Sequence, residues 1–284
     1  MGLKERVPSF LRPAAKLTYN YLQLLYDRHI YERPRLKYRK NVALAAVFPN
    51  FLQYAEILCN EGGVVIPNYF SQNALSQMQS EFERLITTNQ FDSQAASQNT
   101  IHIGKSRIRE SDIFSRLALE PNFIAFAEYY WGKPIALHGG GGTRSEPANI
   151  PDSGSNQWHH DGKRKQLRFF VFLTDVDPDG QCTKFVPGSH LLFHKDLSNS
   201  RVKEDTALAF GKPVACAGPA GSVAILDTNA FHRATRNTTA RRDIWNFSYR
   251  APNPITTPLN PPPPLCPTVV QELDERQKKI ARAG

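Results

Sequence analysis

The chain has 284 residues, of which 40% are hydrophobic, and a formal net charge of +9. This length accommodates one large or two small domains with a substantial core, and the composition excludes a disordered chain. The first 40 residues carry +7 of the net charge. The basic character therefore belongs to an N-terminal extension, and we expect no nucleic-acid partner.

The cysteine pattern and the lack of long apolar runs indicate the compartment. The four cysteines lie far apart and form no CxxC pair, which argues against a disulfide framework or a zinc knuckle. No run of about 18 apolar residues is available to cross a membrane. The N-terminus also lacks the charged-then-apolar design of a signal peptide. We therefore expect a cytoplasmic protein.

The N-terminal extension, residues 1–45, is predicted to contain a basic amphipathic helix. Apolar residues recur at helical spacing from about Pro13 to about Ile30. Such a helix can lie on an anionic membrane surface, or it can dock on its own domain or on a partner. Residues 1–40 are therefore a candidate for peripheral membrane contact, which co-sedimentation with liposomes, with and without these residues, would test.

The main domain, residues 46–250, is predicted to begin with helices. A short helix at about 52–60 precedes an apolar strand in GGVVIPNYF, and Ser71 is a candidate N-cap for the helix that follows. A further helical stretch covers 111–131.

Strand-like runs replace the helical pattern after Gly132. KPIALHGGGGT is predicted to be a strand that runs into a Gly-rich loop, and this loop lacks the sequence context of a phosphate site. Further strands are expected at 157–161, 166–175, 183–186, 214–217, 222–226 and 243–250. Many short strands with little helix between them predict a mainly β fold with flanking helices (α+β), as a sandwich or barrel. Residues 251–284 are predicted to form a Pro-rich extended tail and a short C-terminal helix.

The segment NQWHHDGKRK places two adjacent histidines just before Asp161. In an extended strand residues two apart share a face, so His159 and Asp161 point to one side and His160 to the other. An imidazole and a carboxylate on one face are two corners of a first-row metal site. A second histidine would complete a 2-His-1-carboxylate triad with open coordination positions. A surface cluster in a polar loop is the alternative.

Three histidines downstream of Asp161 are candidates for the third ligand. His190 lies in the tight turn VPGSH, where a histidine more often stabilises the turn, and His194 lies in an irregular segment. His232 follows an apolar strand in GSVAILDTNAFHRAT. It is the best candidate, because ligands from two distant strand ends can meet at the mouth of one barrel.

Two arginines after His232 are candidates for binding a co-substrate. A guanidinium binds a carboxylate through two parallel hydrogen bonds, as a co-substrate with a distal carboxylate would require. Arg241 and Arg242 lead the next predicted strand, and by strand parity only one of them can point inward. An ordinary exposed arginine is the alternative for either.

Together these motifs resemble the phytanoyl-CoA dioxygenase family. The chain contains WHHDG, FLTDVDPDG, FVPGSH and GSVAILDTNAFHRAT followed by an arginine, and EGGVVIPNYFSQNALSQMQSEFERL is similar to the entry of the family's domain. The resemblance covers roughly residues 52–250. It implies a double-stranded β-helix (jelly-roll) fold and an oxygenase that depends on Fe(II) and 2-oxoglutarate, with O2 as the other co-substrate.

The resemblance also implies roles for individual residues. The iron ligands would be His159, Asp161 and His232, and Arg242 would bind 2-oxoglutarate. The step from His232 to Arg242 is one residue shorter than in many members, so Arg241 stays open for that role. Because halogenating relatives have a small residue at the position of Asp161, the resemblance implies hydroxylation or desaturation. A catalytically inactive metal-binding jelly roll with a binding or membrane-recruited regulatory role is the alternative.

Further basic residues are candidates for contact with the co-substrate or the substrate. The resemblance places a basic residue that some members present to the co-substrate near Lys105 or Arg107. Arg144, Lys163 and Arg164 lie in loops predicted on either side of the HxD motif. Basic side chains there would favour an anionic small molecule, whereas merely solvated side chains would have no such role. The substrate and the oligomeric state stay open.

Overall fold

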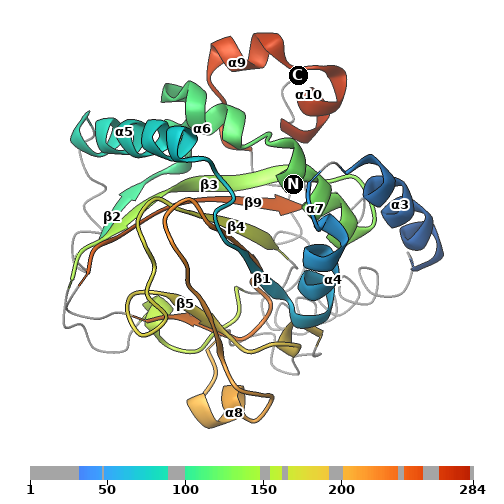
Figure 1. Cartoon of the computed structure of the whole chain (residues 1–284), viewed down its shortest axis with the longest axis vertical. Helices are drawn as coiled ribbons and strands as arrows, with labels where there is room; N and C mark the ends of the chain where they lie inside the picture. The colour runs from blue at the N-terminus through green and yellow to red at the C-terminus, as the bar shows by residue number, and fades with distance from the viewer. Residues whose placement is uncertain are drawn as a thin grey trace, which may run out of the picture.

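The computed structural model describes residues 32–46, 48–88, 100–147, 154–161, 166–191, 201–235, 240–251 and 262–281. Two antiparallel sheets pack face to face, and helices cover the other side of the larger sheet (Figure 1). The larger sheet has the order β1 (Gly63–Ile66), β7 (Val223–Asp227), β4 (Leu167–Phe172), β9 (Arg242–Arg250), β3 (Ala136–Ser145) and β2 (Thr100–Ile103). The smaller sheet has the order β6 (Val214–Cys216), β5 (Thr183–Phe185) and β8 (His232–Ala234). This architecture confirms the predicted mainly β jelly roll with flanking helices.

The larger sheet has two different faces, because successive side chains of a strand point to opposite sides. In β9, the rings of Trp245, Phe247 and Tyr249 pack with the helices, on what we call the outer face. Phe172 of β4 and Ile244 of β9 belong to a second cluster with residues of the smaller sheet, on the inner face. The inner faces of the two sheets therefore bound the interior of the barrel.

Strand β3 corrects one prediction, because it continues through all four glycines instead of ending in a loop. Its partner β9 runs antiparallel, with Gly142 opposite Trp245 and Gly140 opposite Phe247. A Cβ atom added to Gly142 would lie 2.7 Å from the Phe82 ring and 2.9 Å from the Trp245 ring. Glycine allows the aromatic side chains to lie directly on the strand here, and the run of glycines serves packing rather than chain reversal.

Four helices on the N-terminal side follow the sequence pattern with one exception. They are α4 (Phe51–Glu61), α5 (Gln72–Thr88), α6 (Asp112–Leu117) and α7 (Pro121–Trp131). The predicted stretch 111–131 is two helices. Pro121 has no N–H to continue a helix, and it begins α7 instead, where the Glu120 carboxylate accepts the Phe123 N–H at 2.7 Å.

Short elements connect the strands. They are η3 (Lys105–Glu110), η4 (Gly154–Asn156), η5 (Ser189–Leu191) and α8 (Glu204–Leu208). The predicted strand at 157–161 is absent as a regular strand. It is replaced by isolated bridges of His159 to His232 and to Arg201, so one residue rather than a whole strand makes the pairing.

The described parts of both ends of the chain pack on the main domain. Helix α3 (Glu32–Ala45) contacts α7, where Arg39 Nε donates to the Tyr129 carbonyl at 2.7 Å. The C-terminal segment forms two helices, α9 (Pro267–Glu272) and α10 (Glu275–Ala281), instead of one, and contributes Val269 and Ile280 to the main core.

Two predictions about the organisation of the chain are not tested by the structure. The amphipathic helix from about Pro13 to about Ile30 lies outside the described residues, and the domain division at 45 and 250 stays a prediction. Among the described helices, none combines the length and apolar character needed to span a membrane.

Candidate metal centre

Three side chains converge at one end of the barrel interior. Ligand atoms of His159, Asp161 and His232 all lie within 4.8 Å of one another. Oδ1 of Asp161 is 3.6 Å from Nε2 of His159 and 3.8 Å from Nε2 of His232. These separations suit side chains that would together hold a first-row metal ion, since imidazole and carboxylate bind such ions at about 2.0–2.2 Å. Within the described residues this is the cluster able to hold a metal.

Backbone hydrogen bonds bring the three residues together. His159 and His232 exchange N–H···O=C bonds of 2.9 and 2.8 Å, which joins the segment after η4 to the start of β8. The Asp161 N–H donates to the carbonyl of Thr228 at 2.8 Å, just beyond the end of β7. Two segments distant in sequence therefore meet at the same place, as the sequence predicted for His232.

The imidazole rings are oriented for metal binding by their other nitrogen. Nδ1 of His159 lies 2.7 Å from the carbonyl of Gln157, and Nδ1 of His232 lies 2.9 Å from the carbonyl of Ala230. A carbonyl only accepts, so each Nδ1 carries a proton, and Nε2 is the ring atom that faces Asp161. In the neutral form of each ring, Nε2 is therefore the atom available to bind a metal.

The electrostatics favour the same protonation states. Burial lowers the pKa of His232 to about 4, so its ring is neutral at ordinary pH. Burial alone would raise the pKa of Asp161. The neighbouring His159 and the positive charge of Arg168 outweigh that effect and hold this pKa well below its usual range. A neutral His232 ring and an ionised Asp161 carboxylate are the forms in which both groups bind a metal.

The other histidines take different places. His160 is 1% exposed and is not part of the triad, as strand parity predicted. His190 is buried in η5 beside Gly62, and its Nε2 lies 3.1 Å from the Cys59 carbonyl. This contact joins η5 to α4, and the role of His190 in its own turn stays a prediction. His194 lies outside the described residues.

The two candidate arginines of β9 point to opposite faces. Arg241 lies on the outer face, where its Nε is 3.3 Å from Oδ2 of Asp243 and its side chain is 46% exposed. Arg242 shares parity with Ile244 and points inward, where its Nη1 donates to the Gln181 carbonyl at 3.4 Å. The parity argument that only one of them faces inward therefore selects Arg242.

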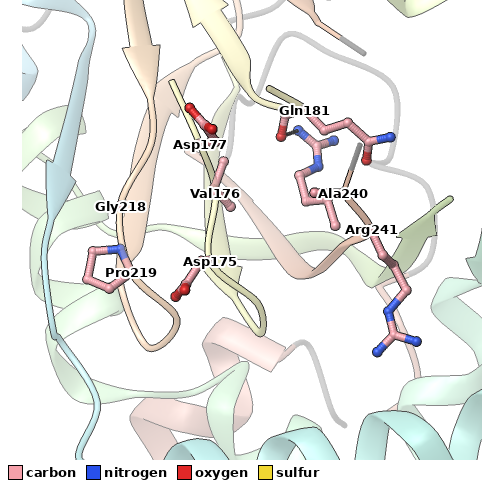
Figure 2. Close-up of a pocket in the computed structure, with 9 residues that line it drawn as sticks. Asp175, Val176, Asp177, Gln181, Gly218, Pro219, Ala240 and Arg241 are labelled. Carbon is pink, nitrogen blue, oxygen red and sulfur yellow. Dashed lines mark hydrogen bonds between the residues drawn. The ribbon is translucent and has the colours of Figure 1, made fainter. Parts of the chain in front are cut away.

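A cavity of about 360 Å³ lies beside the start of β9 (Figure 2). Its lining residues are Asp175, Val176, Asp177, Gln181, Gly218, Pro219, Ala240, Arg241 and Arg242. The side chain of Arg241 extends away from Gln181 (Figure 2). The three residues of the triad are not among the lining, so this cavity adjoins the candidate co-substrate arginine rather than the metal centre.

Arg144 is not placed to meet a substrate. Because β3 continues through the glycines, Arg144 falls on the outer face opposite Asp243. Its guanidinium donates to Asp243 at 2.9 and 2.8 Å and to Glu83 of α5 at 2.5 and 3.2 Å, and its side chain is 6% exposed. This placement argues against the expected substrate contact and assigns Arg144 to the sheet–helix interface.

The remaining predicted basic residues give little support to a binding role. Lys105 begins η3 and is exposed, on the segment that follows the edge strand β2. Arg107 forms an ion pair of 2.8 Å with Glu110 of the same element. Lys163 and Arg164 lie outside the described residues.

One residue next to the triad was missed in the sequence. Arg168 of β4 lies on the inner face with Phe170 and Phe172, and its Nη2 is 3.1 Å from Oδ2 of Asp161. The available signal was a charged residue at an inward position of the apolar strand LRFFVF. Alternation along β4 would have placed Arg168 inside the barrel.

Two facing sheets with a His-Asp-His triad at one end of their interior define the class of a jelly-roll metalloenzyme. A family model described as "Phytanoyl-CoA dioxygenase (PhyH)" matches residues 58–244, which is more than half of the chain. The chain therefore belongs to the phytanoyl-CoA dioxygenase family and is a dioxygenase. This membership, together with the triad, confirms the expected dependence on iron, 2-oxoglutarate and O2.

Individual relatives are distant. The chain is 24% identical over 261 residues to an ectoine dioxygenase of Stutzerimonas stutzeri (strain A1501), covering 78% of this chain and 83% of that protein. Among solved structures it is similar to SnoN, a non-haem α-ketoglutarate-dependent epimerase from nogalamycin biosynthesis. That match has a TM-score of 0.61 and 22% identity, and covers 75% of this chain and 89% of SnoN.

A third similar structure is HygX from Streptomyces hygroscopicus, solved with nickel, 2-oxoglutarate and hygromycin B. The TM-score is 0.52 and the identity 23%, with 69% of this chain and 86% of HygX covered. At these identities the two solved structures support the jelly-roll fold.

Proposed function

We propose that His159, Asp161 and His232 bind Fe(II), that Arg242 binds 2-oxoglutarate, and that the enzyme hydroxylates or desaturates a small molecule. The observation that carries this proposal is the convergence of two Nε2 lone pairs and one carboxylate oxygen at distances of 3.6 and 3.8 Å. Three ligands of this kind on one side of a metal ion leave positions open for a chelating co-substrate and for O2.

The donor set fits iron better than the commoner structural metals. The cluster contains no thiolate, and the described cysteines form no disulfide. Two imidazoles and one carboxylate with open positions are the ligands of non-haem Fe(II) oxygenases. When bound, Fe(II) and 2-oxoglutarate together activate O2 to oxidise a C–H bond, with succinate and CO2 as co-products.

Arg242 is the residue that we assign to the far carboxylate of 2-oxoglutarate. It leads β9 on the inner face, opposite Ser145 of β3, and it lines the cavity beside the start of that strand. A guanidinium offers two parallel N–H donors to a carboxylate and keeps its charge at any working pH. It would hold the co-substrate in one orientation relative to the triad.

The substrate is a separate question. Arg144 neutralises Asp243 and Glu83 on the outer face, so it gives no support for an anionic substrate. The carboxylate of Asp161 occupies the position that halogenating relatives leave to a small residue. We therefore propose hydroxylation or desaturation of a small molecule whose charge is open.

Turnover of 2-oxoglutarate without added substrate tests the proposal. Oxygenases of this kind convert 2-oxoglutarate slowly even when no substrate is present, so we expect Fe(II)-dependent formation of succinate by the full chain in air. His232→Ala should abolish this succinate. His160→Gln, a change to the buried histidine beside the ligands, should retain most of it. Equal succinate from the full chain and from His232→Ala would contradict the proposed ligands.

A further inference from the structure

The two oxygens of Asp161 have different neighbours. Oδ1 faces the imidazoles, 3.6 Å from Nε2 of His159 and 3.8 Å from Nε2 of His232, whereas Oδ2 lies 3.1 Å from Nη2 of Arg168. The contact with Arg168 is an ion pair rather than a well-aligned hydrogen bond. We propose that Arg168 is a positioning residue that keeps Asp161 a one-oxygen ligand of the metal. This inference rests on the metal site of the proposed function.

The backbone fixes Asp161 and Arg168 relative to each other. Thr228, just beyond β7, accepts the N–H of Asp161 at 2.8 Å and donates its own N–H to the carbonyl of Gln166 at 3.0 Å. Gln166 immediately precedes β4, and Arg168 is two residues further along on the same side of that strand. One residue therefore holds both the ligand and the start of the strand that carries the guanidinium.

The position of Arg168 in the sheet makes a packing role a poor explanation. On the inner face it lies between Leu226 of β7 and Ser248 of β9, and the next inward residues of β4 are Phe170 and Phe172. A charged side chain in such a row loses hydration, which an apolar residue would not. The side chain is 36% exposed and its partner Asp161 is 21% exposed, so the pair is partly shielded from water.

The ion pair has a consequence for the number of open coordination positions. A carboxylate can bind a metal through one oxygen or through both. If both oxygens of Asp161 bound, the triad would occupy four positions, and a chelating co-substrate and O2 would compete for the rest. With Oδ2 attracted to Arg168, Asp161 takes one position, and three remain open as the chemistry requires.

Binding of Co(II), a spectroscopic substitute for Fe(II), tests this inference without turnover. We would compare the full chain with Arg168→Met, Arg168→Gln and Arg168→Lys, measuring Co(II) affinity by competition with a chelator and the visible ligand-field spectrum. Removing an outer partner of a metal ligand typically weakens binding by about 10- to 100-fold. We expect a loss of that size in Arg168→Met and Arg168→Gln, a changed spectrum, and partial recovery of both properties in Arg168→Lys.

Arg233→Met is the matched control. Arg233 follows the ligand His232 but lies over the Trp158 ring at 4.9 Å and 3.4 Å from Oε1 of Glu204. It should bind Co(II) with the affinity and spectrum of the unchanged chain. Circular dichroism would establish that each variant is folded.

The outcomes separate the inference from the function on which it rests. If the unchanged chain bound no Co(II) and no Fe(II), the proposed metal site would be wrong, and the role of Arg168 with it. If the unchanged chain bound Co(II) and a folded Arg168→Met or Arg168→Gln variant bound it with the same affinity and spectrum, the metal site would stand and the positioning role of Arg168 would be overturned.

Discussion

Arginines occur on both the outer and the inner face of the larger sheet, but they serve different purposes there. Arg144 on the outer face contacts two carboxylates, those of Asp243 and Glu83, and its side chain is 6% exposed. Arg168 on the inner face contacts the single carboxylate of Asp161 and is 36% exposed. One guanidinium is fully neutralised within the structure, while the other lies beside a proposed metal ligand. Position on the strand, rather than residue type, decides which arginine serves stability and which serves chemistry.

The start of β9 repeats this contrast within two consecutive residues. Arg241 belongs to the outer-face ion cluster, 3.3 Å from Asp243, whereas Arg242 points into the barrel beside Gln181. The outer face is sealed by aromatic rings and by paired charges. The inner face keeps polar groups close to the triad, and substitutions on the two faces should therefore affect different properties.

The largest expected effect is on metal binding. His232→Ala removes one of the three proposed ligands, so Fe(II) affinity should fall by more than the roughly 10- to 100-fold that an outer-shell partner contributes. His160→Ala should leave most of the affinity, because strand parity turns this ring away from the triad. Isothermal titration with Fe(II) under anaerobic conditions measures both. Loss of binding in a folded His160→Ala variant would break the parity argument.

On the outer face, Arg144→Met should strongly destabilise the fold. It leaves Asp243, whose side chain is 5% exposed, without its principal partner. Removing one member of a buried ion pair costs about 3–5 kcal/mol in the free energy of unfolding. Urea denaturation measures this value. A loss below about 1 kcal/mol, the range of surface pairs, would mean that Asp243 is hydrated and that the outer face is not sealed.

The glycines of β3 should tolerate no side chain on the outer face. Gly142→Ala forces its Cβ toward the rings of Phe82 and Trp245 and should cost about 1–3 kcal/mol of stability. Gly104→Ala is the matched control, because its Cβ would meet no atom closer than Ser106 Oγ at 3.9 Å. Thermal unfolding of the two variants should differ by several degrees. Equal melting temperatures would show that β3 shifts freely under the rings.

The smallest expected effect on stability belongs to Arg241. Its side chain is 46% exposed, so Arg241→Met should change the free energy of unfolding by about 0.5 kcal/mol or less. A chemical denaturation curve coincident with that of the unchanged chain is the expected result. A loss of unfolding free energy comparable to that of Arg144→Met would mean that both arginines belong to one essential cluster, and would contradict the difference expected between them.

The residues of the candidate site were easier to predict from the sequence than the helices and strands that surround the site. Strand parity is a local rule, so it placed His159 with Asp161 and turned His160 away although no regular strand forms there. The helix split at Pro121 had a local signal in the proline itself, whereas the passage of β3 through its glycines depends on tertiary contacts. The rings that cover Gly140 and Gly142 come from α5 and β9, and no local pattern around the glycines shows them.

Arg144 and Arg168 are two further examples of what a local sequence pattern can and cannot predict. Arg144 was expected in a loop because glycines usually end strands, and the pairing with β9 that keeps it in the sheet is a long-range feature. Arg168 was detectable as a charged residue in an apolar strand. Its ion-pair partner Asp161 was not evident from the sequence. Hydrogen bonds to Thr228, which is distant in the sequence, hold Asp161 close to the start of β4.

The central claim is that the inner face binds the iron and its co-substrate while the outer face does not. Anaerobic addition of Fe(II) and then 2-oxoglutarate to metal-free protein tests it most directly, because the chelate of the two gives a weak visible charge-transfer band. The band should appear with the unchanged chain and with Arg241→Met, and should be lost, or need far more 2-oxoglutarate, with Arg242→Met. A band in Arg242→Met at the same 2-oxoglutarate concentration as in the unchanged chain, or its loss in Arg241→Met alone, would contradict the assignment.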